Sequence, residues 1–235
     1  MPALRSQREL PGVPSLPEGR RALLIRMLGW ICWVAATLGP ASADPGDYSI
    51  FFSRAFPGSV PAYFDVVVES SGAVAYRESE DEEPLEFEIG AAELAEVLEH
   101  VKDLDYFRVA VDSNLKVAFT GEKTFRYEGA DSVSGEMKFN YTSNVAARAL
   151  LAWFNKVGES ERHRIELTRT ARFDRLGVNK TLLQFQISLE KNRIVSPAQF
   201  IPILKRIANN KKIIHIATAR AAGLLERIQA PATNQ

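Results

Sequence analysis

Hydrophobic and polar residues alternate along most of the chain between Tyr48 and Thr142. A period of two is typical of antiparallel strands that bury one face and leave the other in water. Apolar residues between Leu94 and Leu104 depart from this pattern, because they recur at helical spacing and predict one helix over 91–104. The alternation predicts strands at 64–68, 73–77, 85–89, 115–120 and 137–142.

After Thr142 the apolar period changes to 3.6 residues. An apolar stripe with Trp153 at its centre predicts a helix, and we expect Trp153 to be buried against the sheet. Residues 159–175 carry nine charges in seventeen positions and predict a solvated helix. Residues 182–189 fit both a helix and a strand, and their helical neighbourhood favours the helix. Two further helices are predicted at 196–207 and 214–228.

Because the strands come first and the helices follow, the order predicts an α+β fold rather than a sheet wound from βαβ units. We expect an antiparallel sheet with one inserted helix, followed by a C-terminal helical half packed on the sheet. Residues 44–235 are expected to form a single globular domain, with a β-rich half at 44–142 and a helical half at 143–235.

The first residues carry a targeting pattern. A basic leader is followed by a charge-free apolar run over 27–39 and then by the small residues Ala41 and Ala43. This order is typical of secretory signals, and it predicts a signal peptide over residues 1–43 that is cleaved after Ala43. The protein is therefore expected to be exported, either to a periplasm or out of the cell.

Two alternatives remain open for the leader. The apolar run is shorter than the roughly 20 residues that span a bilayer, which favours cleavage over an uncleaved N-terminal anchor. Arg20 and Arg21 precede three apolar residues in the manner of a twin-arginine export motif. Ordinary secretion is favoured because Arg26 interrupts the apolar run.

Removing the leader changes the composition. The leader holds five of the 29 basic and two of the 29 acidic residues, so the remainder has 24 basic and 27 acidic residues and a formal charge of −3. This balance argues against nucleic acid as a partner, and we expect no stable membrane insertion after cleavage. Cys32, the only cysteine, lies in the leader, so the mature chain has no disulfide, thiol nucleophile or thiolate metal site.

One part of the chain resembles a known kind of domain. Arg54, the loop GSVPAY at 58–63, Gly72 and Tyr76 occur in this order. They resemble an uncharacterised exported bacterial domain that opens with a strand, a cysteine-flanked glycine loop, Pro-x-Tyr and a β-hairpin. The resemblance covers residues 48–108 and implies export, without implying any chemistry.

Two features qualify this resemblance. Phe56 and Val60 stand where that family usually has its cysteines, so the disulfide of the loop is missing. The segments 173–178 (FDRLGV) and 219–222 (ARAA) are similar to the tails of exported bacterial proteins of unknown role.

Glu159, His163 and Glu166 are spaced i, i+4 and i+7, which on a helix places two carboxylates and an imidazole on one face. Such a set could bind a metal or serve in acid–base chemistry. The neighbouring arginines would repel a divalent cation, so a charged surface helix is the favoured interpretation.

An acidic run and two further histidines are also interpreted as ordinary structural residues rather than as parts of a site. The acidic run at 78–83 has no glycine at a bend, as a calcium loop requires, and fits a solvated loop. His100 and His215 have no partner in the sequence. We therefore predict no catalytic residue, no metal ligand and no bound cofactor.

The solvent-exposed face of the predicted sheet could carry a basic strip formed by Lys116, Arg126 and Lys138. Two strand registers are possible. One places Arg126 opposite Lys138 and creates a site for an anionic ligand. The other places Glu128 between Lys116 and Lys138, and it is favoured because the row then neutralises itself.

The sequence thus favours a non-enzymatic binding or structural module of the cell envelope, whose partner is a protein or another envelope component. One alternative is an exported hydrolase whose carboxylates and histidine meet only in three dimensions. The other is an envelope protein held by an uncleaved N-terminal anchor.

Overall fold

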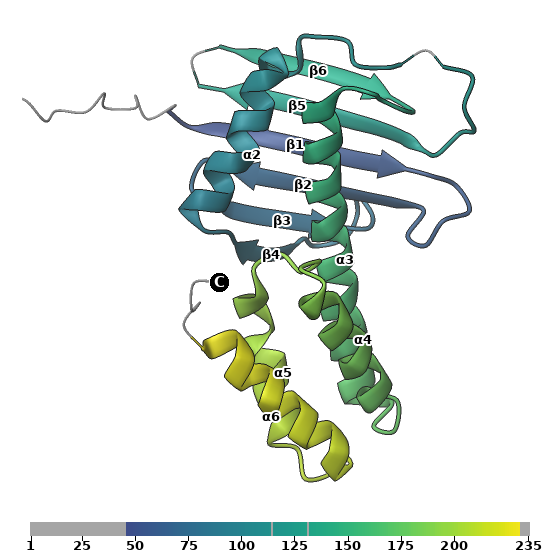
Figure 1. The fold of residues 1–235 in the computed structure, drawn as a ribbon, viewed down its shortest axis with the longest axis vertical. Coiled ribbons are helices and arrows are strands. Elements are labelled where there is room, and N and C mark those ends of the chain that lie inside the picture. The colour runs from purple at the N-terminus through teal and green to yellow at the C-terminus, as the bar shows by residue number, and fades with distance from the viewer. Residues whose placement is uncertain (1–45, 114, 131, 231–235) are drawn as a thin grey trace, which may run out of the picture. The chain divides into compact units, whose positions relative to one another are not determined.

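The computed structural model describes residues 46–113, 115–130 and 132–230. They form an antiparallel sheet and a set of helices that mostly follow it in the chain, so the predicted α+β class is confirmed (Figure 1). The predicted signal peptide, with its cleavage residues Ala41 and Ala43, lies outside the described residues.

The sheet has the strand order β4-β3-β2-β1-β5-β6, so β1 is central and β4 and β6 are the edges. Each neighbouring pair is antiparallel. The strands are β1 (Tyr48–Ala55), β2 (Tyr63–Glu69), β3 (Ala73–Arg77), β4 (Leu85–Glu88), β5 (Glu122–Gly129) and β6 (Ser134–Phe139).

The helices agree with the predicted positions, and α3 continues without a break through the charged segment that begins at Glu159. In the described ranges, no helix is both long and apolar enough to cross a membrane. The helices are α2 (Ala91–Asp103), α3 (Val145–Phe173), α4 (Val178–Glu190), α5 (Ile201–Ala208) and α6 (His215–Gln229), with the short turns η2 (Asp105–Phe107) and η3 (Pro197–Phe200).

Alternation along the strands sends one set of side chains toward α2 and the first half of α3, which cover one face of the sheet (Figure 1). Phe52 of β1 lies opposite Val66 and Phe125 on this face, and all three are fully buried. We call the apolar cluster between the sheet and these two helices the sheet core.

The helix phase predicted for α3 is wrong by one position. Phe154, and not Trp153, lies at the centre of the sheet core, where its ring stacks on Phe52 with centroids 4.6 Å apart. Trp153 is only half-buried, and its Nε1 donates to Glu93 of α2 at 2.8 Å. The exchange has a physical reason, because an indole N–H needs a polar partner that the aromatic interior does not offer.

The second half of α3 packs with α4, α5 and α6 around a separate apolar cluster. We call this cluster the helical core; Leu167, Leu182, Phe185, Leu204 and Ile207 are among its fully buried members. The helices after Thr142 are therefore divided, and only the first half of α3 lies against the face of the sheet.

Polar contacts join the helical half to the edge strand β4. Arg164 Nη1 donates to the carbonyl of Glu86 at 3.0 Å, and Ser196 Oγ donates to the carbonyl of Glu88 at 2.7 Å. The hydroxyl of Ser160 accepts from the backbone N–H of Val195 at 2.9 Å. The bonds from Arg164 and Ser196 satisfy outward carbonyls of an edge strand that would otherwise be open to another chain.

The predicted strand at 115–120 is not formed, and each described residue of this segment is exposed. The segment cannot pair with β5, the next strand in the chain, because β1 and β6 already occupy both edges of β5. Phe119, 57 % exposed, contacts only the ring of Phe56 among the described aromatic rings. Alternation in this segment therefore does not indicate a buried face.

Candidate anion-binding site

A lysine occupies a core-facing position at the start of β5. Lys123 pairs with Phe139 of β6 and with Arg54 of β1, and its side chain is only 6 % exposed. Its Nζ donates to the carbonyl of Thr120 at 3.1 Å, to the hydroxyl of Thr120 at 2.7 Å and to the carbonyl of Asn140 at 2.7 Å. The ammonium is thus surrounded by neutral oxygens, which solvate the charge without cancelling it.

The side chain of Asn140 builds this oxygen cage. Its Oδ1 accepts from the backbone N–H of Thr120 at 2.8 Å, and its Nδ2 donates to the carbonyl of Ala118 at 3.2 Å. Asn140 therefore holds the 118–120 segment as a neighbouring strand would. Gly121 completes the turn at φ +95°, where a Cβ would lie 2.7 Å from that of Phe56.

Three cations meet at this end of the sheet. Lys123 and Arg54 lie opposite each other on the same face, and Arg148 stands on the first turns of α3. None of the three forms an ion pair with a carboxylate among the described residues. Burial and then the charge of Arg54 lower the pKa of Lys123, and burial lowers the pKa of Arg54.

A cavity of about 330 Å³ opens beside Lys123, between the ends of β5 and β6 and the first turns of α3. No acidic side chain lines it. The positive end of the helix dipole of α3 lies nearby, since α3 begins at Val145 with Asn144 as its cap. The polar residues that line the cavity are Thr120, Lys123, Asn140, Tyr141, Thr142, Arg148 and Asn155.

This arrangement can accept an anion. A carboxylate or phosphate in the cavity would neutralise a buried charge that now has only neutral partners, and the exposed guanidinium of Arg148 could bind it in a bidentate manner. Tyr141 and Asn155 add hydrogen-bonding groups at the rim. The donors present suit an oxyanion, and they offer a metal ion no anionic ligand.

The structure brings together only part of the candidate triplet on α3, for which a charged surface helix was the favoured interpretation. Glu159 and His163 meet at Ser188 of α4, whose Oγ lies 2.9 Å from Glu159 Oε1 and 3.0 Å from His163 Nε2. Glu159 also pairs with Arg193 at 2.6 Å. Glu166 points elsewhere and pairs with Arg169 at 2.9 Å.

The chemistry of this cluster is that of a packing contact. Ser188 gives its one proton to Glu159, so it accepts its second hydrogen bond from His163 Nε2–H. An imidazole in that tautomer cannot take a proton from the serine. Burial lowers the pKa of His163, which keeps the ring neutral inside the helical half.

The basic strip predicted on the open face is neutralised, although in neither predicted register. Arg126 lies opposite Glu136 rather than Asn140 or Lys138. Arg126 pairs with Glu128 at 3.1 Å, and Lys138 pairs with Glu136 at 3.5 Å. Both predicted registers are wrong because the β5–β6 turn is tighter than either assumed. The N–H of Gly129 donates to the carbonyl of Val133 at 2.9 Å, and the partner of Arg126 lies two positions before Lys138 and four before Asn140.

The other two candidate histidines, His100 and His215, lie outside both cavities. The first cavity is the one at Lys123, and the second lies between α4 and α6. Within the described ranges, no three histidine, aspartate or glutamate side chains converge as metal ligands would.

Sequence reasoning missed Lys123, although a signal was present. Lys123, Phe125 and Tyr127 share one face of an alternating strand, so a lysine in phase with two buried aromatic residues marks a buried charge. The chain was also compared with known proteins: no family model matches it, and no curated protein sequence does.

Proposed function

We propose that this protein is an exported, non-enzymatic binding module that holds a small carboxylate- or phosphate-bearing ligand in the Lys123 cavity. One observation carries the proposal: a buried ammonium with only neutral partners faces a cavity that holds a second, unpaired cation and no acid. Export is supported by the leader pattern that ends at Ala43.

Binding is favoured over hydrolysis by the side chains that the cavity collects. Among the described residues, no histidine or acidic side chain lines the cavity, and the close histidine–serine pair of His163 and Ser188 is packed between helices elsewhere. A ligand held by Lys123 and Arg148 would have charge recognition without a base or nucleophile poised against it.

Calorimetric titration of the protein with inorganic phosphate and with citrate tests the proposal. We expect saturable binding of at least one of these anions that weakens as salt rises. Lys123→Met and Arg148→Gln are each expected to weaken binding by about tenfold or more, because the first removes the buried positive charge beside the ligand and the second removes a charge-assisted contact. Lys138→Gln removes an exposed lysine from the opposite face and serves as the control.

Arg148 is exposed, so its variant tests the site even where Lys123→Met fails to fold. Equal affinity in the wild type, Arg148→Gln and Lys138→Gln would overturn the proposal. So would the absence of binding by both anions at low salt.

A further inference from the structure

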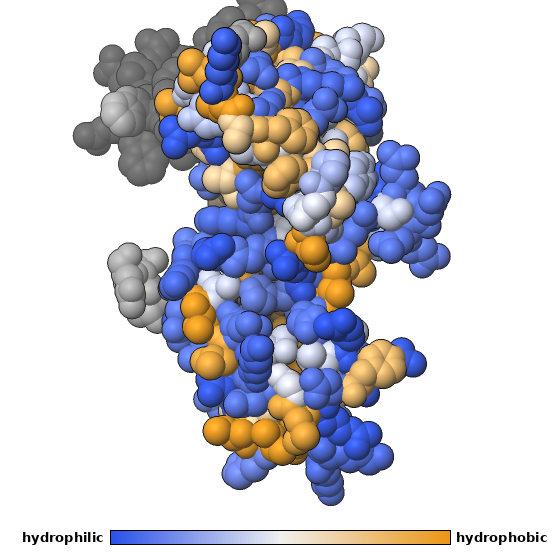
Figure 2. Space-filling model, turned by 90° about the vertical axis from the view of Figure 1, so that its right-hand side faces the viewer, coloured by the Kyte–Doolittle hydropathy of each residue, from blue (hydrophilic) through white to orange (hydrophobic). Residues whose placement is uncertain are grey.

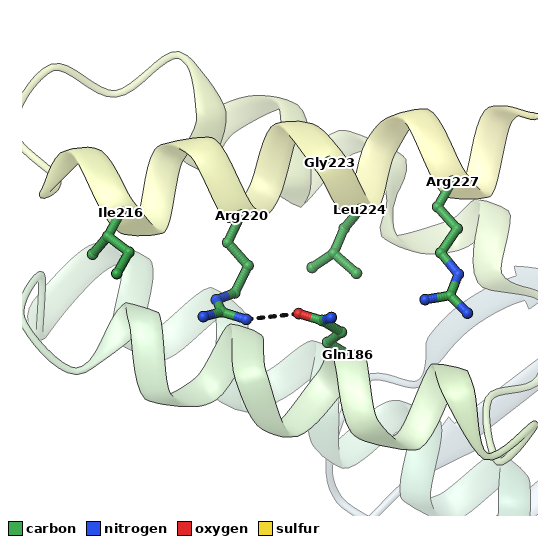
Figure 3. A pocket seen from close by; sticks show the side chains of 6 residues that line it. All are labelled: Gln186, Ile216, Arg220, Gly223, Leu224 and Arg227. Carbon is green, nitrogen blue, oxygen red and sulfur yellow. Dashed lines mark hydrogen bonds between the residues drawn. The ribbon is translucent and has the colours of Figure 1, made fainter.

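The helical half carries a groove that the Lys123 site does not use. It lies between α4 and α6 and encloses about 440 Å³ (Figure 3). One stripe of α4 (Asn179, Leu183, Gln186, Glu190) and one of α6 (Ile216, Arg220, Gly223, Arg227) have the same spacing of i, i+4, i+7 and i+11. Two aligned helical stripes of this kind form a channel that a third helix can enter.

Gly223 leaves the floor of this groove open. It lies inside α6, where glycine weakens a helix relative to alanine. A Cβ at this position would meet no atom within 4 Å, so the packing of the chain itself does not require glycine. The missing side chain lets another backbone approach α6 closely.

Arg220 supplies an oriented positive charge beside Gly223. Its Nε donates to Asn179 Oδ1 at 3.2 Å and its Nη1 donates to Gln186 Oε1 at 2.7 Å. Both acceptors are neutral amides, and no described carboxylate pairs with this guanidinium. Arg227 at the other end of the groove differs, because Glu190 neutralises it at 2.9 Å.

Apolar side chains flank the charge. Ile216, which lines the groove, is 57 % exposed, and Leu183, between Asn179 and Gln186 on the stripe of α4, is 41 % exposed. Figure 2 shows that hydrophobic residues on the surface of the helical half stand in small groups among hydrophilic ones. An apolar rim around one unneutralised cation matches a partner that is apolar on one face and acidic beside it.

We propose that the α4–α6 groove binds an acidic amphipathic helix of a partner protein. Its backbone passes over Gly223, its apolar side chains contact Ile216 and Leu183, and one of its carboxylates pairs with Arg220. The proposal is independent of the Lys123 cavity, which lies at the sheet.

Two synthetic helices of about four turns provide the probes. Both carry leucines at i, i+4, i+7 and i+11; one has glutamate beside them, and the other has lysine at the same positions. Binding is measured by fluorescence anisotropy. We expect the acidic helix to bind at least about tenfold more tightly than the basic one, with an affinity that falls as salt rises.

Gly223→Leu and Arg220→Gln are the test variants, and Lys211→Gln is the control outside the groove. Gly223→Leu fills open space and favours the helix, so it should keep or raise thermal stability while weakening binding of the acidic peptide by about tenfold or more. Arg220→Gln should remove the preference for the acidic peptide. Lys211→Gln should change neither.

Three results would overturn the proposal. They are failure of the acidic helix to bind the wild type, equal affinity for both peptides, and unchanged affinity in a stably folded Gly223→Leu variant. Sedimentation velocity adds a fourth: a concentration-dependent dimer that Gly223→Leu abolishes would assign the groove to a second copy of this chain.

Discussion

The sheet core and the helical core are filled by different side chains. Rings make up ten of the 25 described buried residues of the sheet core, where Phe154 contacts Phe52 at 4.6 Å and Phe125 at 5.7 Å. They make up only two of the 13 in the helical core, where branched aliphatic side chains dominate. A flat sheet surface accepts stacked rings, whereas helix ridges interdigitate through leucine and isoleucine. Since α3 contributes to both cores, the polar residues at its middle decide whether the two cores behave as one.

Those middle residues include a buried carboxylate. Glu161 is fully buried, and Arg164 Nε lies 2.7 Å from its Oε2. Neither carboxyl oxygen accepts a well-aligned hydrogen bond among the described residues. Two apolar cores are thus joined through a charged pair whose solvation is incomplete.

The largest effect is expected from removing the central ring. Phe154→Ala should lower the free energy of unfolding by about 3–5 kcal/mol, because it leaves a cavity where several rings meet. Leu204→Ala is the matched change in the helical core and should cost about 2–5 kcal/mol. Urea denaturation followed by circular dichroism measures both.

Because α3 spans both cores, we expect each of these variants to shift one shared transition. A curve with two transitions in Leu204→Ala, one of them at the wild-type position, would show that the sheet core folds without the helical core. That result would show that the sheet core and the helical core unfold as two independent units.

The next largest change in the free energy of unfolding is expected from Glu161, which lies between the two cores, and this change depends on pH. Burial raises the pKa of Glu161 from 4.5 to about 7, against the opposing charge of Arg164. The folded state therefore binds this proton more tightly than the unfolded chain does. The resulting stabilisation is complete below about pH 4.5 and is lost as the pH rises through about 7, and it amounts to about 3 kcal/mol.

Glu161→Gln should remove this dependence. Urea midpoints measured across this window should fall with rising pH in the wild type relative to the variant. Burial lowers the pKa of His163, so that residue has the opposite effect, but both proteins carry it and the difference isolates Glu161. A parallel pH dependence in the two proteins would show that Glu161 does not titrate in this range.

Much of the fold follows from local periodicity, because alternation and helical spacing report which faces are buried. Residues 64–68 and 91–104 were predicted in this way and form β2 and α2. The segment 115–120 alternates equally well and forms no strand, since strand pairing depends on which edges are already occupied. Hydrophobic periodicity is a property of one segment, whereas strand pairing depends on the arrangement of the whole sheet.

The candidate site was less predictable for a related reason. Its cations, Lys123 and Arg148, come from β5 and α3, which are separate elements of the chain and meet only after the sheet has formed. The triplet on α3 was a candidate from spacing alone, and a charged surface helix was favoured over it; in the structure Glu166 pairs with Arg169 of its own helix, apart from the other two. Spacing within one element cannot indicate where a neighbouring element lies.

The smallest change in the free energy of unfolding is expected at Trp153, at the boundary of the sheet core. Measuring it tests the corrected helix phase of α3. Trp153 packs edge-to-face on Phe154 at 5.0 Å and ties α3 to α2 through Glu93. Trp153→Phe keeps a ring and loses the hydrogen bond, so we expect a loss of about 1 kcal/mol. Glu93→Gln keeps a neutral acceptor and should lower the free energy of unfolding by less. A double-mutant cycle of the two changes should give a coupling energy close to the energy of the Trp153–Glu93 hydrogen bond. A Trp153→Phe loss as large as that of Phe154→Ala would place the indole inside the sheet core, and additive losses in the cycle would show that the contact with Glu93 does not join the two helices.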